Sequence, residues 1–98
     1  MYRYVVIRED MSMSQKLVQL AHVCLTETPH VLEDKVNICL LSVSDAVELH
    51  TLRVKCGFNN CKVFFDPDYH KGPTALVTKV YDENDEARNL FKDYKLFR

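Results

Sequence analysis

The chain has 98 residues, of which 47% are hydrophobic and 28% charged, with only two glycines and three prolines, so it suits one compact domain over residues 1–98 and excludes a second domain or a disordered segment. Thirteen basic and fourteen acidic residues give a net charge of -1, which excludes a global positive field and requires any polyanion site to be local. No apolar run approaches the roughly 20 residues of a membrane helix and no leader pattern opens the sequence, so we expect a cytoplasmic protein with no membrane partner.

The hydrophobic pattern predicts four strands and three helices. A β-branched and aromatic run predicts a first strand over residues 2–7. The stretch from Ser14 to about Glu27 has no Gly or Pro and predicts a helix that Ser14 caps and Pro29 stops. The elements expected after it are a strand over 36–43, a helix between a cap at Ser44 and a stop at Gly57, strands over 61–65 and 74–81, and a last helix that begins at Asp82.

This order of elements predicts the fold class. Two right-handed crossovers would make the first three strands parallel, and a short loop would make the fourth antiparallel to one of them. We therefore expect an α/β protein, a single-domain three-layer sandwich whose small four-stranded mixed sheet (β-α-β-α-β-β-α) is flanked by three helices. Ligands of such sheets bind outside the carboxyl ends of the parallel strands, which here means the turn at 8–14 and the loop at 66–73.

The first helix carries one candidate site. Helical periodicity gathers four uncharged polar residues on one side, Gln15, Gln19, His22 and Thr26. It gathers five apolar residues on the side expected to face the core, Leu17, Leu20, Ala21, Cys24 and Leu25. An imidazole, glutamine amides and the neighbouring cation of Lys16 could together hold a polar, anionic substrate. The alternative is that the polar side is the solvated face of an amphipathic helix.

The loop after the strand at 61–65 carries a second candidate site. Its polar residues are Asp66, Asp68, Tyr69, His70, Lys71 and Thr74. An aspartate there could orient or deprotonate a water, Lys71 could contact a phosphate, and Thr74 could hydrogen-bond an ester oxygen. The alternative is an Asp-Pro turn with ordinary surface charges.

The cysteines and histidines do not predict a metal site. Cys24 and Cys39 lie inside apolar runs, so free thiols are expected rather than disulfides. The spacing of the other two cysteines is at the edge of structural zinc patterns, and the histidines are not closely paired. The four side chains concerned are Cys56, Cys61, His50 and His70. We expect neither a metal nor another cofactor.

Several short motifs follow one another in a recognisable order. A strand runs into Arg8-Glu9-Asp10, and the next helix contains Gln19-Leu20-Ala21-His22. Later, a strand ends in Asp66, and Gly72-Pro73-Thr74-Ala75-Leu76 follows it. In this order they resemble the type 2 peptidyl-tRNA hydrolases, with their Arg-x-Asp turn, Ala-Gln-x-x-His-Ala helix, Asp-Ala-Gly turn and Thr-bearing strand. The segment at 93–97 resembles that family's closing helix and its Leu-Lys-Leu end.

The resemblance implies hydrolysis of the ester between a peptide and the terminal ribose of a tRNA, in the cytoplasm and without a metal. Carried over by position, it implies that Gln19, His22, Asp66 and Thr74 bind or activate the substrate. The residues then expected to contact the tRNA are Lys16, Lys71, Gln15 and His70. Members of the family often pair, so a homodimer is a possible assembly.

Two departures from the family pattern support a second hypothesis. The family has a lysine four residues before the motif glutamine, where this chain has Gln15, and Lys16 is one step out of phase. Pro67, Asp68 and His70 replace the Ala, Gly and Thr of the family's turn. On this alternative, the chain is a catalytically inactive homologue that binds tRNA or a protein.

Overall fold

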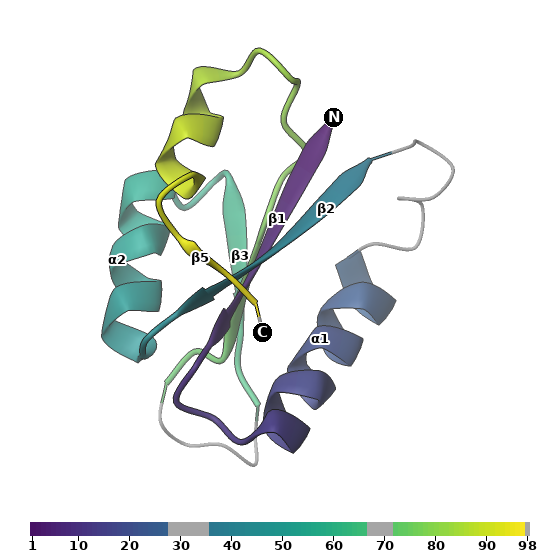
Figure 1. Cartoon of the computed structure of the whole chain (residues 1–98), viewed down its shortest axis with the longest axis vertical. Helices are drawn as coiled ribbons and strands as arrows, with labels where there is room; N and C mark the ends of the chain where they lie inside the picture. The colour runs from purple at the N-terminus through teal and green to yellow at the C-terminus, as the bar shows by residue number, and fades with distance from the viewer. Residues whose placement is uncertain (28–35, 67–71, 98) are drawn as a thin grey trace.

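The computed structural model describes residues 1–27, 36–66 and 72–97, which form one small α/β domain (Figure 1). Its elements in chain order are β1 (Tyr2–Arg8), α1 (Met13–Glu27), β2 (Asn37–Val43), α2 (Ala46–Cys56), β3 (Cys61–Phe64), β4 (Ala75–Thr78), the 3₁₀ helix η1 (Glu86–Phe91) and β5 (Lys95–Leu96). Within the described residues, no helix has the length and apolar character needed to cross a bilayer.

Five strands of the described chain form one mixed sheet in the order β3-β4-β1-β2-β5. β1 and β2 pair in parallel along their whole length, whereas β4 is antiparallel to both β1 and β3. β3 therefore runs in the same direction as β1, and the predicted strand directions are confirmed. The predicted count of four strands is wrong, because β5 pairs antiparallel with the outer side of β2.

The residues of β1 alternate between two hydrophobic cores. Tyr4 and Val6 belong to a cluster with residues of α2 and η1, whereas Val5 and Ile7 belong to a cluster with Val23 of α1. Successive side chains of a strand point to opposite faces of the sheet. Helix α1 therefore covers one face, while α2 and η1 cover the other (Figure 1). A strand buried on both faces is apolar throughout, which explains the continuous run that predicted it.

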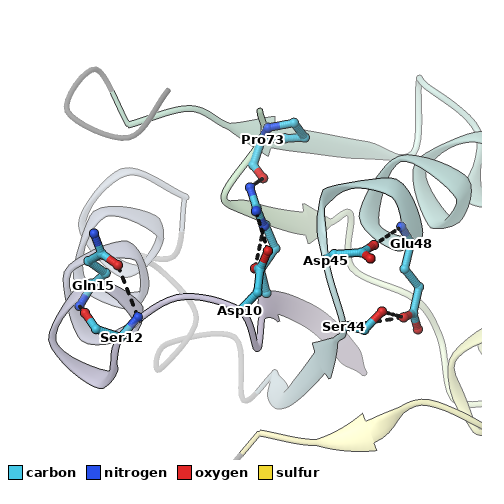
Figure 2. Close-up of polar contacts among 8 residues, drawn as sticks. Asp10, Ser12, Gln15, Ser44, Asp45, Glu48 and Pro73 are labelled. Atoms are coloured by element: carbon cyan, nitrogen blue, oxygen red, sulfur yellow. Dashed lines mark hydrogen bonds and ion pairs between the residues drawn. The ribbon is translucent and has the colours of Figure 1, made fainter. Parts of the chain in front are cut away.

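Helix α1 is capped by Ser12, not by Ser14 as predicted. The backbone N–H of Gln15 donates to Ser12 Oγ (3.2 Å), and the backbone N–H of Ser12 donates to Gln15 Oε1 (3.1 Å; Figure 2). This reciprocal pair is a capping box, which satisfies two backbone donors at once. Ser12 has the glutamine three residues later that such a box needs, and Ser14 does not.

Helix α2 begins and ends on local signals. Its cap is Asp45 rather than the predicted Ser44, because the carboxylate of Asp45 accepts the backbone N–H of Glu48 at 2.9 Å (Figure 2). Ser44 instead donates its backbone N–H and its hydroxyl to the Glu48 carboxylate. Gly57 ends the helix with φ +97°, as predicted. A side chain there would be strained by the left-handed φ and would meet Asn60 Nδ2 at 3.0 Å.

The predicted last helix is wrong in both type and extent. Asp82 does not begin a helix; Asp85 caps the shorter η1, accepting the backbone N–H of Ala87 at 2.9 Å. The ring of Phe91 stacks on that of Tyr4 with centroids 4.2 Å apart, which ties η1 to the core of the sheet. The chain then enters β5, where the resemblance implied the end of a closing helix.

Candidate active site at the carboxyl edge of the sheet

The turn at 8–14 and the described ends of the loop at 66–73 lie at one edge of the sheet. β1 and β3 end at this edge, which lies at the bottom of Figure 1 beside the first turns of α1 and α2. The Nη1 of Arg8, at the end of β1, donates to the carbonyl oxygen of Pro73 at 3.2 Å. The turn at 8–14 is therefore in contact with the chain just before Thr74.

Gln19 of α1 lies at the centre of a hydrogen-bond network at this edge. Its Nε2 donates to Asp66 Oδ2 at 2.7 Å, and its Oε1 accepts from Thr74 Oγ1, also at 2.7 Å. Thr74 Oγ1 lies in addition 3.1 Å from the carbonyl oxygen of Phe64. Three of the four predicted catalytic residues, from three separate segments, are thus joined through the Gln19 amide.

The burial of Gln19 sets the rotation of α1. Gln19 and Thr74 are 1% and 0% exposed, and burying an amide without hydrogen bonds costs roughly 2–7 kcal/mol. The two short bonds to Asp66 and Thr74 offset that cost. Gln19 and Val23, one turn apart, consequently both face the sheet.

The predicted inner face of α1 is accordingly wrong at two positions. Leu17 is 55% exposed and Ala21 is also exposed. The prediction treated glutamine as a surface residue because its two partners, 47 and 55 positions away, are invisible in a local pattern. Three further residues of the two predicted faces have side chains outside the described part of the structure: Cys24, Leu25 and Thr26.

The other candidates on α1 lie nearer the surface. The side-chain oxygen of Gln15 is held in the helix cap, and His22 is exposed one turn after Gln19. The alternative of a solvated polar face therefore fits Gln15 and His22 but not Gln19. Lys16 is half-buried and lines a cleft.

Arg8 is a structural residue of the site to which the sequence analysis assigned no role. Its side chain is 3% exposed and donates to both carboxylate oxygens of Asp10, through Nε at 2.8 Å and Nη2 at 2.6 Å. Such paired, charge-assisted bonds fix geometry as well as adding energy. With its bond to Pro73, Arg8 clamps the turn after β1 to the chain before β4 (Figure 2). The sequence feature that could have indicated this role is the Arg-x-Asp pattern at the end of a strand.

A cleft of about 650 Å³ opens at the same edge, beside the first turns of α1. Its lining residues come from the ends of β1 and β2, from α1 and from the C-terminal segment: Arg8, Glu9, Lys16, Ser42, Lys95, Leu96 and Phe97. Among the described residues, neither Lys16 nor Lys95 takes part in an ion pair. Lys95 was missed because its segment was expected to be helical.

Part of the second candidate site lies outside the described residues. This holds for Pro67 and for four of the six polar residues of that site: Asp68, Tyr69, His70 and Lys71. Among the residues that are described, no group of three or more side chains is arranged to hold a metal ion. The site that can be built therefore consists of Asp66 and its two supporting residues, with His22 exposed one helical turn after Gln19.

Three cysteines are free thiols away from this edge, as expected, namely Cys39, Cys56 and Cys61. Burial, and after it the neighbouring Cys56, raise the pKa of the Cys61 thiol to about 11. Cys56 Sγ lies 3.4 Å from the hydroxyl of Tyr81, whose pKa is raised, first by burial and then by that contact. A thiol that resists ionisation is a poor nucleophile, so this cluster belongs to the core.

The network leaves one of its three members accessible. Asp66 is half-buried, whereas Gln19 and Thr74 are fully enclosed. A carboxylate held in one orientation at a sheet edge can take a proton from a water or accept hydrogen bonds from a ligand. Comparisons with known proteins add nothing to this geometry, since no protein-family model and no curated protein matches the chain.

Proposed function

We propose that the chain hydrolyses the ester bond of a peptidyl-tRNA, releasing the peptide and free tRNA in the cytoplasm. The observation that carries the proposal is the Gln19 network, in which an enclosed amide holds the Asp66 carboxylate at 2.7 Å and is itself held by Thr74 at 2.7 Å. A buried glutamine whose amide nitrogen and oxygen both need hydrogen-bond partners from distant segments is costly in free energy for a surface helix. This cost is accounted for if the orientation of the Asp66 carboxylate matters for function.

In the proposed reaction, Asp66 is the general base. It takes a proton from a water whose oxygen attacks the ester carbonyl carbon, and the bond from that carbon to the ribose oxygen then breaks. The proton is returned to the ribose oxygen, so the products are a peptide carboxylic acid and a tRNA with a free hydroxyl. His22, exposed one helical turn after Gln19, hydrogen-bonds the ribose oxygen as it leaves.

Gln19 and Thr74 take positioning roles in this scheme. Both side chains are enclosed and engaged with protein atoms, which favours support of Asp66 over direct contact with the substrate. The ester of an acylated tRNA is already reactive, so an oriented base and a bound substrate supply much of what the reaction needs. Lys16 and Lys71 are proposed to contact the tRNA phosphates.

The test is turnover of an N-blocked aminoacyl-tRNA by the wild type and by Asp66→Asn, with His22→Gln as a second variant. Loss of a general base typically costs 10²- to 10⁴-fold in rate, and we expect a loss of about this size in kcat for Asp66→Asn. The matched control is Asp82→Asn, because Asp82 is exposed and follows Tyr81, which pairs with Tyr2 at the opposite edge of the sheet.

Two outcomes would overturn the proposal. The first is equal turnover by the wild type and a folded Asp66→Asn. The second is salt-dependent retention of tRNA by the wild type without release of peptide, which would establish the alternative of a binding module. The specific observation behind that alternative is the enclosure of Gln19 and Thr74, since a fully satisfied network also stabilises a protein that has no activity.

A further inference from the structure

The cleft beside the first turns of α1 has the composition of a site for an extended anion. Lys16 lies on α1 and Lys95 on β5, so two ammonium groups from different elements line one concavity of about 650 Å³. A third cation, Arg8, is already paired with Asp10. Cations that line a cleft focus the field there more strongly than they would on a flat surface, and with a net charge of -1 any polyanion site of the chain has to be local in this way.

Among anionic ligands, the remaining lining residues favour a nucleotide chain. Glu9 is a hydrogen-bond acceptor on the cleft wall, and its Oε1 is oriented by the Ser42 hydroxyl at 2.8 Å. A carboxylate repels phosphate but accepts hydrogen bonds from ribose hydroxyls. Phe97 and the 63% exposed Leu96 add apolar surface, and an aromatic ring is the usual platform for an unpaired base. Phosphate, ribose and base thus each have a matching group.

A second cleft limits how far such a chain can extend. It has a volume of about 500 Å³ and shares Glu9, Ser42 and Lys95 with the first, but it adds two carboxylates, Glu48 and Asp93, against one further cation, Lys55. This excess of negative charge would disfavour a phosphodiester backbone that passed beyond Lys95. The first cleft alone has the volume of a site for a small molecule, which suits about one or two nucleotides of a single strand.

We infer that this cleft binds the single-stranded end of an RNA. Lys16 and Lys95 contact its phosphates, Glu9 accepts a ribose hydroxyl, and Phe97 stacks against a base. The inference rests on the proposed function for the identity of the RNA, a tRNA bearing its ester at that end. Arg8 lines the cleft and also donates to Pro73, next to Thr74, so an RNA held there lies beside the Asp66 network.

Binding of a short single-stranded RNA, followed by fluorescence anisotropy over a series of salt concentrations, tests the inference without requiring catalysis. We expect Lys16→Gln and Lys95→Gln each to weaken binding and to lower the log–log salt slope by about 0.7, the value for one phosphate contact on a single strand. Phe97→Leu should weaken binding about 5- to 100-fold, as the loss of one stacked base does. The matched control is Lys92→Gln, because Lys92 is exposed and lines a different cleft.

The role of Glu9 has its own readout. The DNA oligonucleotide of the same sequence should bind more weakly than the RNA to the wild type, since it lacks the 2′-hydroxyl. Glu9→Ala, which removes the acceptor, should reduce that difference. Equal affinity for RNA and DNA would overturn the ribose contact.

The outcomes separate this inference from the proposed function. RNA binding that depends on Lys95, together with no ester hydrolysis, supports the cleft and overturns the hydrolase. Ester hydrolysis in which Lys95→Gln leaves KM unchanged overturns the cleft and leaves the hydrolase standing. Identical RNA affinities for the wild type, Lys95→Gln and Lys92→Gln also overturn the cleft.

Discussion

Replacement of Gln19 by methionine tests whether the hydrogen-bond network at the carboxyl edge determines how α1 sits on the sheet. Methionine has nearly the same length and shape, so the substitution removes the two amide bonds without opening a large cavity. The bond to Asp66 involves a charged partner and is worth about 1.5–3 kcal/mol. Thr74 keeps an acceptor, because its hydroxyl also lies 3.1 Å from the carbonyl oxygen of Phe64. We therefore expect Gln19→Met to lower the free energy of unfolding by about 2 kcal/mol.

The neighbouring variant Thr74→Val completes a double-mutant cycle. It leaves the buried Gln19 oxygen without its hydroxyl donor, at a cost of about 1–3 kcal/mol. Both single variants break the same Thr74–Gln19 bond, so the double variant should cost less than the sum, by roughly 1 kcal/mol.

Urea denaturation gives the free energy of unfolding of the wild type, the two single variants and the double variant, whose m-values should be equal. In a domain of this size each kcal/mol lost should lower Tm by about 4–8 °C. The control is Gln15→Met on the exposed side of the same helix, where only half of a capping box is lost and a cost of about 0.5 kcal/mol is expected. If Gln19→Met were as stable as Gln15→Met, or if the cycle were additive within about 0.3–0.5 kcal/mol, the network would not position the helix.

Three further predictions follow from single contacts. Asp10→Asn should cost about 2 kcal/mol in urea denaturation, because it leaves the 3% exposed Arg8 side chain without its anionic partner; no loss of stability would contradict the clamp. Leu17→Gln should change stability by less than about 0.5 kcal/mol because Leu17 is 55% exposed. Val23→Ala, at a fully buried position, should cost about 2 kcal/mol. If Leu17→Gln cost more than Val23→Ala, the inner face of α1 predicted from the sequence would be the correct one. The pKa of Cys61 is raised to about 11, so its contribution to stability is complete below the unfolded pKa near 9 and is lost as pH rises from 9 to 11. At pH 8, iodoacetamide should alkylate Cys61 at least about 10-fold more slowly than an unperturbed thiol, because the thiolate fraction falls about 100-fold while the nucleophilicity of the thiolate rises with its pKa, and an equal rate would refute the shift.

The parts of the fold that depend on local patterns could be read from the sequence. The continuous apolar run of β1 reflects burial on both sheet faces, and the Gly57 stop reflects a single backbone angle. The directions of the four predicted strands followed from connection lengths and handedness alone. The two loops were placed at one edge by the same topology, and Arg8 and Pro73 show that they touch.

The parts that depend on distant partners could not be read in this way. β5 has two residues and exists because the backbone of the C-terminal segment pairs with β2, so it leaves little periodic signal of its own. The segment before it has enough acidic and apolar residues for a helix, yet it forms only the short η1, whose Phe91 stacks on the distant Tyr4. The cap of α1 was predictable in principle, because Ser12 and Gln15 have the spacing of a capping box.

Gln19 shows why chemistry was easier to predict than orientation. Polar residues at helical spacing suggest a binding or catalytic site, but the same pattern places them on the solvent-exposed face of the helix. The pattern shows that a residue is polar and does not show which hydrogen-bond partners it has. Burial becomes favourable only when a donor and an acceptor meet the amide from outside the helix, as Asp66 and Thr74 do. The two hydrogen bonds of Gln19 can thus outweigh the free energy lost by leaving Leu17 exposed, since full burial of a leucine side chain contributes about 1.5–3 kcal/mol. The rotation of α1 that results is what turns Gln19 toward Asp66, and the stability of the helix and the geometry of the candidate site therefore depend on the same two hydrogen bonds.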